Sequence, residues 1–187
     1  FRFFLKYKVF CAVMAPECGP YGPMSHLNWH LHPETMRRRE KSARPLARFC
    51  GEVAKVQLSK GLHFIQEQPH PSALYEVQPW PAVLKDERVG QVIYDRCAAG
   101  LRVTKGPHKG LYLKKPSSMT ASHSDLVFYF ETFVCPHSPG QHLTGDGHNQ
   151  ELKAAQVWTW REANSIVRGI QRLKPVSYTH LRAHETG

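Results

Sequence analysis

The chain has 187 residues, of which 41% are hydrophobic, and it carries a formal net charge of +10. Such a chain is long enough for one domain with a real core, and the excess of basic residues favours a polyanionic partner such as nucleic acid. It contains no run of 18 apolar residues, which excludes a membrane-spanning helix, and its five scattered cysteines exclude a secreted disulfide framework. We therefore expect no membrane partner and an intracellular location, cytoplasmic or nuclear.

The first predicted element is a strand over residues 1–15, with its most buried part at Val9–Met14. The apolar run stops at Pro16-Glu17-Cys18-Gly19-Pro20, which predicts an irregular loop just past the strand. In open α/β sheets, ligands bind at the carboxyl ends of the strands. Cys18 is therefore placed for chemistry, although a cysteine in such a position is more often a small hydrophobic residue.

A polar loop around Trp29 and a basic segment follow this strand. Because proline is tolerated at the start of a helix but not in its interior, the main helix is predicted from about Pro45 to Lys60, ending at Gly61. The short apolar segment 63–66 predicts a second buried strand, which ends in Glu67-Gln68-Pro69. Strand, helix and strand together predict a βαβ unit with two parallel strands.

The remaining elements complete an α/β domain over residues 1–174. We predict a short helix over 79–88, a third strand over 91–96, a basic loop over 102–115, and a fourth strand over 117–122 that pairs with the third as a hairpin. Residues 124–133 are predicted to be helical, 134–150 rich in turns, and 151–173 a final helix. The expected fold has parallel strands, an antiparallel hairpin at one edge of the sheet, and helices on both faces.

The two residues that follow the parallel strands form the first candidate site. Both Cys18 and Glu67 are predicted just past the ends of neighbouring strands, so a thiol and a carboxyl can face one pocket. Such a pair suits attack on an electron-poor ring, in which the thiolate adds to carbon and the carboxyl protonates a ring nitrogen. The alternative is that Glu67 only caps the turn that follows its strand.

Basic residues supply a second candidate function, which is contact with nucleic-acid phosphates. The candidates are Arg37, Arg38, Arg39, Lys114 and Lys115. A solvated helix face is the commoner meaning of the arginine run. A third set, Cys135, His137, His142 and His148, has ligands suited to zinc, but its spacing matches no common zinc module. A surface loop is therefore expected there, and no metal is assigned.

The order of several short motifs resembles one protein family. Pro16-Glu17-Cys18 after the first strand and Glu67-Gln68-Pro69 after the second resemble the Pro-Cys and Glu-Asn-Val motifs of cytosine-C5 DNA methyltransferases. Further motifs resemble the methyltransferase-like domain of copia-type retrotransposon polyproteins of unicellular algae. They are Tyr94 to Leu101 (YDRCAAGL), Lys114 to Ser117 (KKPS), Ala121-Ser122-His123 and the Cys/His loop. The resemblance covers about residues 9–173.

This resemblance implies a fold and an activity. It implies the C-terminal half of a Rossmann-like methyltransferase sheet, Cys18 as the nucleophile, Glu67 as the group that activates cytosine, DNA as the partner and S-adenosylmethionine as the cofactor of the full-length relative. The glycine loop that holds the cofactor would precede residue 1, and Glu17 stands where the family has proline. We therefore expect no cofactor binding and no turnover from this fragment of a longer polyprotein.

Two further expectations complete the sequence-based interpretation. A non-enzymatic alternative is a basic domain that binds nucleic acid or scaffolds the polyprotein. Residues 175–187 are similar to a translated sequencing adapter, follow Lys174-Pro175 and lack apolar periodicity. They are expected to form a disordered and dispensable tail.

Overall fold

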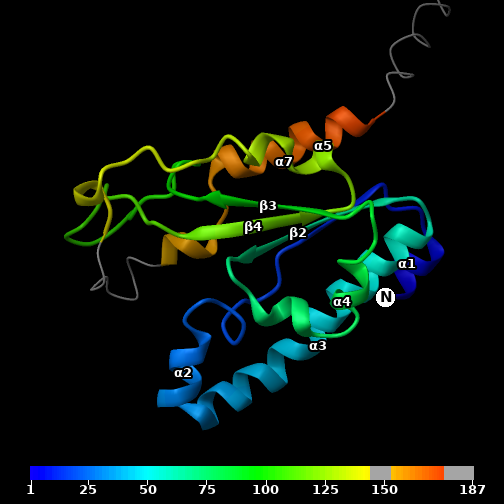
Figure 1. Ribbon diagram of the computed structural model, residues 1–187, viewed down its shortest axis with the longest axis horizontal. Helices are drawn as coiled ribbons and strands as arrows, with labels where there is room; N and C mark the ends of the chain where they lie inside the picture. Colours follow the sequence, from blue (N-terminus) through cyan, green and yellow to red (C-terminus); the bar gives the residue numbers. More distant parts are fainter. Residues whose placement is uncertain (144–152, 175–187) are drawn as a thin grey trace, which may run out of the picture.

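A four-stranded mixed sheet lies at the centre of the computed structural model, which describes residues 1–143 and 153–174. The strands are β1 (Cys11–Met14), β2 (His63–Pro69), β3 (Gly90–Asp95) and β4 (Pro116–Ala121), in the order β1-β2-β4-β3. Strands β1 and β2 are parallel, whereas β4 is antiparallel to both β2 and β3. Helices cover both faces of the sheet (Figure 1). These findings confirm the α/β class, the parallel pair and the antiparallel hairpin at one edge.

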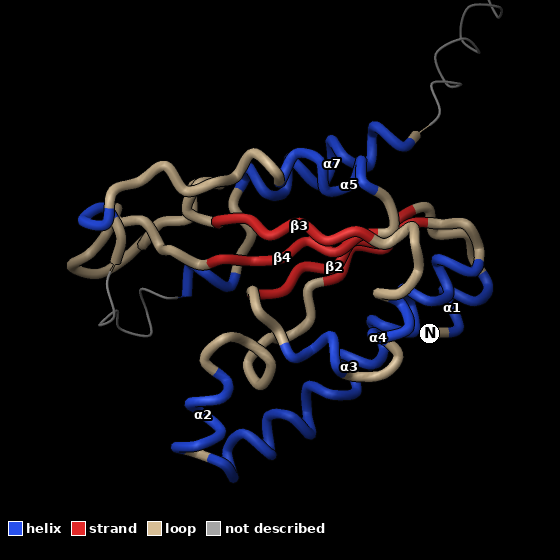
Figure 2. Tube along the Cα trace, in the orientation of Figure 1, coloured by secondary structure: helices blue, strands red, loops and turns tan. Residues whose placement is uncertain are grey.

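The long helix α3 (Pro33–Ser59) packs with α4 (Trp80–Val83) and the 3-10 turn η1 (Ala73–Glu76) on one face of the sheet (Figure 2). Phe64 of β2 and Trp80 of α4 are fully buried in this core, with their rings in an edge-to-face contact. The indole nitrogen of Trp80 donates a hydrogen bond of 2.9 Å to the carbonyl of Ala47. This bond joins α4 to the middle of α3.

The opposite face is covered by α5 (Ser124–Val127), the 3-10 turn η2 (Phe128–Phe130) and α7 (Trp160–Leu173). Alternate residues of β2 point to this side, so Ile65 packs here while Phe64 packs under α3. Helix α7 approaches α5 closely at Gly169, where an added Cβ would lie 2.8 Å from the carbonyl oxygen of Leu126. Only glycine fits this contact without displacing the backbone of α5.

The first fifteen residues differ from the predicted strand, because only Cys11–Met14 form a strand. Residues Arg2–Lys6 form the short helix α1, and the ring of Phe4 packs against Phe49 of α3. The ammonium of Lys60 donates to the carbonyl oxygens of Phe4 and Leu5 at the end of α1. The start of the predicted strand is therefore a helix that packs against α3.

The region between β1 and β2 is more helical than predicted. The expected loop around Trp29 forms α2 (Ser25–Leu31), and α3 begins at Pro33 rather than at Pro45. Pro45 lies inside α3 on the exposed side, where water can bind the carbonyl that loses its amide partner. The buried positions Met36, Ala43 and Ala47 continue through the proline, so packing against the core keeps the helix intact.

Gly61 follows the end of α3 with a positive φ of 65°, as expected for a residue that ends a helix. Two other helices are shorter than predicted. The short helix α4 covers only Trp80–Val83. The final helix begins at Trp160, after the 3-10 turn η4 (Lys153–Gln156) and the capping residue Thr159. No helix among the described residues has the length and apolar character needed to cross a membrane. The predicted tail, 175–187, lies outside the described residues.

Candidate functional site

Strand register explains how Cys18 and Glu67 come together. Strand β1 ends at Met14 opposite Gln66, so β2 continues past the end of its parallel neighbour. Glu67 lies inside β2, paired with Met119 of β4, and not in the loop after the strand as predicted. The chain that leaves β1 runs alongside this free edge, where the side-chain amide of Gln68 donates a hydrogen bond of 3.0 Å to the carbonyl of Pro16.

The loop and the strand open onto one cleft of about 720 Å³. Cys18, Glu67 and Lys115 line it together, although they are far apart in the sequence. The backbone amides of Tyr21 and Gly22 both donate to the carbonyl of Cys18, which fixes the loop as a turn. The remaining lining residues come from the β1 loop, α3, the end of β3 and the segment before α7: Ala15, Pro16, Glu17, Gly19, Arg39, Arg96, Ala155, Gln156, Val157 and Trp158.

The carboxyl of Glu67 is buried without a full set of partners. The residue is 8% exposed, and its Oε1 atom has no hydrogen-bond partner among the described residues. Burial raises the pKa of Glu67, and the nearby charges of Arg96 and Lys115 only partly oppose this shift. Because its raised pKa makes the protonated form more populated than in an exposed glutamate, Glu67 can donate a hydrogen bond or a proton to a basic atom in the cleft.

The thiol of Cys18 is half-buried beside Lys115. Burial raises the pKa of Cys18, the charge of Lys115 lowers it, and the carboxylates of Glu67 and Glu17 raise it further. Burial also lowers the pKa of Lys115, whose ammonium donates a hydrogen bond of 2.9 Å to the carbonyl of Ala155. Neutralising Glu67 would remove a charge that disfavours the thiolate, so the protonation states of the two groups are linked.

Arg96, which lines the cleft, belongs to a buried ion pair with Glu162. The guanidinium of Arg96 contacts both carboxylate oxygens of Glu162, at 2.6 and 2.9 Å, and donates to the carbonyls of Ala155 and Val157. The hydroxyl of Tyr94 donates a hydrogen bond of 2.8 Å to the same carboxylate. Burial tends to raise the pKa of Glu162, but the hydrogen bond and charge of Arg96, together with the bonds from Thr159 and Tyr94, outweigh it, and the pKa is lowered. This network holds the segment 155–157 beside the cleft.

The basic residues predicted to contact phosphates lie partly in the cleft and partly outside it. Arg39 lines the cleft, and Arg38 lines a shallow hollow beside it that also includes Glu17. Arg37 pairs with Glu34 on α3. Lys115 lies in the cleft, whereas its neighbour Lys114 is exposed and is not part of the lining. The structure thus brings two of the five predicted basic residues to the cleft itself.

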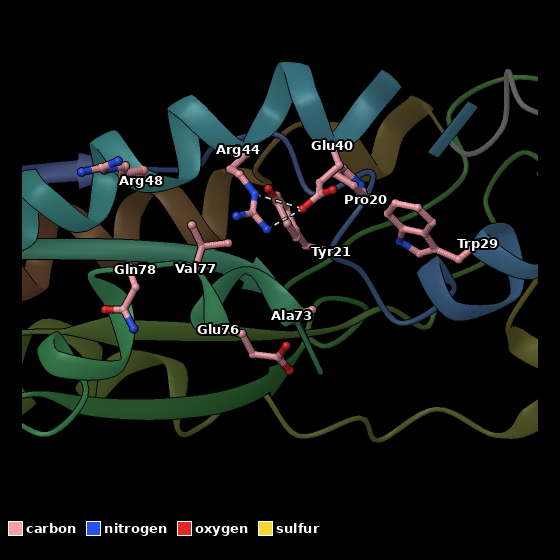
Figure 3. A pocket seen from close by; sticks show the side chains of 10 residues that line it. All are labelled: Pro20, Tyr21, Trp29, Glu40, Arg44, Arg48, Ala73, Glu76, Val77 and Gln78. Atoms are coloured by element: carbon pink, nitrogen blue, oxygen red, sulfur yellow. Dashed lines mark hydrogen bonds and ion pairs between the residues drawn. The ribbon is translucent and has the colours of Figure 1, made fainter. Parts of the chain in front are cut away.

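A second hollow of about 400 Å³ is lined by the loop after β1, by α2 and α3, and by residues 73–78 (Figure 3). Trp29 extends toward it from α2. Arg44 and Glu40 of α3 also line it and form an ion pair of 2.8 Å. The hydroxyl of Tyr21 is buried there and has no hydrogen-bond partner among the described residues. This hollow is lined by loop and helix surfaces and lacks the thiol found in the cleft.

A cluster of cysteine and histidine side chains lies at the end of β3. Ligand atoms of Cys97, Cys135, His137 and His142 all lie within 4.8 Å of one another. Three of these belong to the set singled out in the sequence, and His148 lies outside the described residues. The fourth, Cys97, comes from the turn after β3 and was not among the ligands predicted from the sequence.

The residues that sequence reasoning missed are Arg96, Cys97 and Glu162. Arg96 and Cys97 stand directly after a predicted strand, in the segment that carried part of the family resemblance, and that position was the available signal. Glu162 stands three residues after Thr159 in a capping box, so its sequence context indicated only a helix start.

Comparison with protein-family models, with curated proteins and with solved structures finds no match to this chain. The function of the cleft is therefore inferred from its own residues.

Proposed function

We propose that the cleft receives a pyrimidine base of a nucleic acid between the Cys18 thiol and the Glu67 carboxyl, in a domain related to cytosine-C5 DNA methyltransferases. The observation that carries the proposal is that these two residues, far apart in sequence, line one cleft with Lys115. Its volume of about 720 Å³ falls in the range of about 300–1,000 Å³ typical of small-molecule pockets. Arg39 at the cleft and Arg38 beside it suit the phosphates on either side of a base flipped out of its helix.

The chemistry of the pair follows from its surroundings. The Cys18 thiol first releases its proton to solvent, favoured by the charge of Lys115. The thiolate then forms a bond to carbon 6 of the pyrimidine, and the electron pair of the carbon 5–carbon 6 double bond shifts through the ring to nitrogen 3. Protonated Glu67 gives its proton to that nitrogen and becomes a carboxylate. The product is a covalent adduct with a nucleophilic carbon 5.

Methyl transfer from S-adenosylmethionine would complete the reaction of the related enzymes. None of the described residues is assigned to that cofactor, and we propose that the chain alone does not turn over. Formation of the thiol adduct is therefore the reaction to test.

The test uses an oligodeoxynucleotide duplex that carries pyrimidin-2-one, a base without the amino group that makes cytosine a poor electrophile. After incubation and denaturation, mass spectrometry is expected to find the oligonucleotide attached to the peptide that contains Cys18. The Cys18→Ser variant should give no adduct, and Cys11→Ser should give as much as the wild type. Glu67→Gln should slow adduct formation by about 100-fold or more, as expected for loss of a general acid.

A second candidate function is supported by the charges around the thiol. Burial, Glu67 and Glu17 all raise the pKa of Cys18, while exposed arginines on α3 remain available to phosphates. This combination favours a domain that binds nucleic acid without bond formation. Salt-dependent binding of the duplex with no adduct would support this second function and contradict the first. The absence of both adduct and binding would contradict both.

A further inference from the structure

The turn after β3 and the loop 134–143 place four metal-binding groups around one point. The backbone amide of Asp95 donates a hydrogen bond to the carbonyl of Phe133. The carboxylate of Asp95 accepts a hydrogen bond of 3.0 Å from the backbone amide of Cys135. Cys97 follows in the same turn, two residues after Asp95. These bonds bring the two thiols together, although they are separated by more than thirty residues in the sequence.

Tyr112 contacts the chain at both histidines of the cluster. The segment Pro139–Gln141 forms the 3-10 turn η3, and the backbone of Tyr112 bonds to Gln141 and Leu143 on either side of His142. The ring of His137 stacks on Tyr112 with 3.5 Å between ring centres, and the guanidinium of Arg102 lies over the same tyrosine ring. Tyr112, which lies outside the cluster, therefore orients the ring of His137 and fixes the backbone on both sides of His142.

Two distances within the cluster match those of a tetrahedral site. Sγ of Cys135 lies 3.6 Å from Nδ1 of His137 and 3.4 Å from Nε2 of His142. Around a tetrahedral Zn²⁺ with Zn–S of about 2.3 Å and Zn–N of about 2.05 Å, a sulfur and a nitrogen lie about 3.5 Å apart. Cys97 is buried, and the other three residues are half-buried, so the group is shielded but can be reached by an ion.

We propose that Cys97, Cys135, His137 and His142 bind one Zn²⁺ ion as a structural site. Two thiolates and two imidazoles in tetrahedral arrangement select zinc over hard cations such as Mg²⁺ or Ca²⁺. On binding, both thiols release their protons to solvent and coordinate as thiolates. All four positions are filled by the protein, which is the arrangement of structural rather than catalytic zinc.

The position of the cluster indicates what the ion stabilises. Among the residues that the structure describes, the adjacent core cluster contains three buried hydrophobic residues, Leu101, Val103 and Leu113. A metal ion would join the β3 turn to the loop 134–143, where apolar burial is small. Cys97 also directly follows Arg96, so the same ion would fix the turn that carries the guanidinium into the cleft wall. This inference does not depend on the proposed reaction of Cys18.

The test is metal content and coordination of the full chain purified under reducing conditions with zinc present. Elemental analysis is expected to give about one zinc per chain, and X-ray absorption to give about two sulfur ligands at 2.3 Å and two nitrogen ligands near 2.05 Å. Substitution by Co²⁺ should give the intense visible bands of tetrahedral coordination with thiolate charge transfer. These measurements need no mutation, so they remain decisive if a ligand variant fails to fold.

Variants identify the ligands. Cys97→Ser and His142→Ala should weaken Co²⁺ and Zn²⁺ binding by more than about 100-fold, since loss of a ligand exceeds the 10- to 100-fold effect of outer contacts. Cys11→Ser and His26→Ala, which replace the same residue types elsewhere, should bind like the wild type. Absence of bound metal, unchanged affinity in Cys97→Ser, or a disulfide between Cys97 and Cys135 in the reduced preparation would overturn the proposal.

Discussion

Glu67 and Glu162 are both buried on the α7 side of the sheet, but their surroundings give them opposite properties. Glu162 accepts hydrogen bonds from Arg96, Tyr94 and the backbone amide of Thr159, and its pKa is lowered. Glu67 has an unpartnered oxygen, and its pKa is raised. A buried carboxylate with a full set of partners holds structure together, whereas one without them is available for a ligand.

The largest expected effect comes from breaking the ion pair of Glu162 with Arg96. Glu162→Gln leaves the guanidinium of Arg96 buried without its counter-charge, and we expect a loss of about 3–5 kcal/mol in the free energy of unfolding. Chemical denaturation measures this loss. Glu87→Gln, at an exposed position, serves as the control and should change stability by less than about 0.5 kcal/mol. A similar small change for Glu162→Gln would show that the ion pair does not support the cleft wall.

The opposite change in stability is expected for Glu67→Gln. Because the folded protein holds a proton on Glu67 more tightly than the unfolded chain does, wild-type stability contains a contribution that is lost as pH rises through the raised pKa. Glutamine lacks this loss, so the variant should be more stable than the wild type at neutral pH, by about 1–3 kcal/mol.

The pH dependence separates this effect from a change in packing. The stability difference between Glu67→Gln and the wild type should shrink as pH falls through the raised pKa toward and below the ordinary pKa of glutamate. There, Glu67 becomes neutral in both the folded protein and the unfolded chain. A constant difference at all pH values, or a destabilised variant at neutral pH, would contradict the assignment of Glu67 as an unpaired buried acid. Urea denaturation at several pH values provides the measurement.

Much of this contrast could not be predicted from the sequence. The parallel strands, the hairpin and the pairing of Cys18 with Glu67 at one sheet edge follow from local apolar runs and βαβ geometry. The partners of Glu162 do not, because Arg96 and Tyr94 come from β3 and its following turn, far away in the chain. Pro45 misled the prediction of α3 because proline disfavours a helix interior locally, while burial of Met36 and Ala47 outweighs that preference.

The same limit applies to the cysteine and histidine cluster. Cys135, His137 and His142 are close in sequence and could be recognised together. Cys97 joins them only because Asp95 ties the β3 turn to the chain after Phe133. Lys114 and Lys115 are adjacent, and only the conformation at the start of β4 decides which of them enters the cleft.

A moderate effect is expected on the reactivity of Cys18. Removing the charge of Lys115 should raise the thiol pKa further, because that charge is the main influence that lowers it. We expect Lys115→Met to slow iodoacetamide modification of Cys18 several-fold at neutral pH. Lys114→Met, which changes the exposed neighbour, should leave the rate unchanged. Peptide mass spectrometry follows the modification, and equal rates in both variants would remove Lys115 from the site.

The smallest effect concerns the arginines of α3. Arg39→Ala should weaken binding of an oligodeoxynucleotide and reduce the salt slope of the binding constant by about 1, as expected for one lost phosphate contact. Arg37→Ala should have little effect, because Arg37 is paired with Glu34. Fluorescence anisotropy at several salt concentrations measures both variants. A larger loss for Arg37→Ala would place the nucleic acid along α3 rather than at the cleft.

The most direct test of the contrast between the two carboxylates, and of the base-binding role proposed for Glu67, is a carbon-13 NMR titration of the glutamate carboxyl groups. Glu67→Gln and Glu162→Gln identify the two resonances. We predict that Glu67 titrates above the ordinary range of glutamate and Glu162 below it, and that a duplex containing pyrimidin-2-one shifts the Glu67 resonance but not that of Glu162. A Glu67 pKa at or below that of Glu162, with no response to the duplex, would contradict the account.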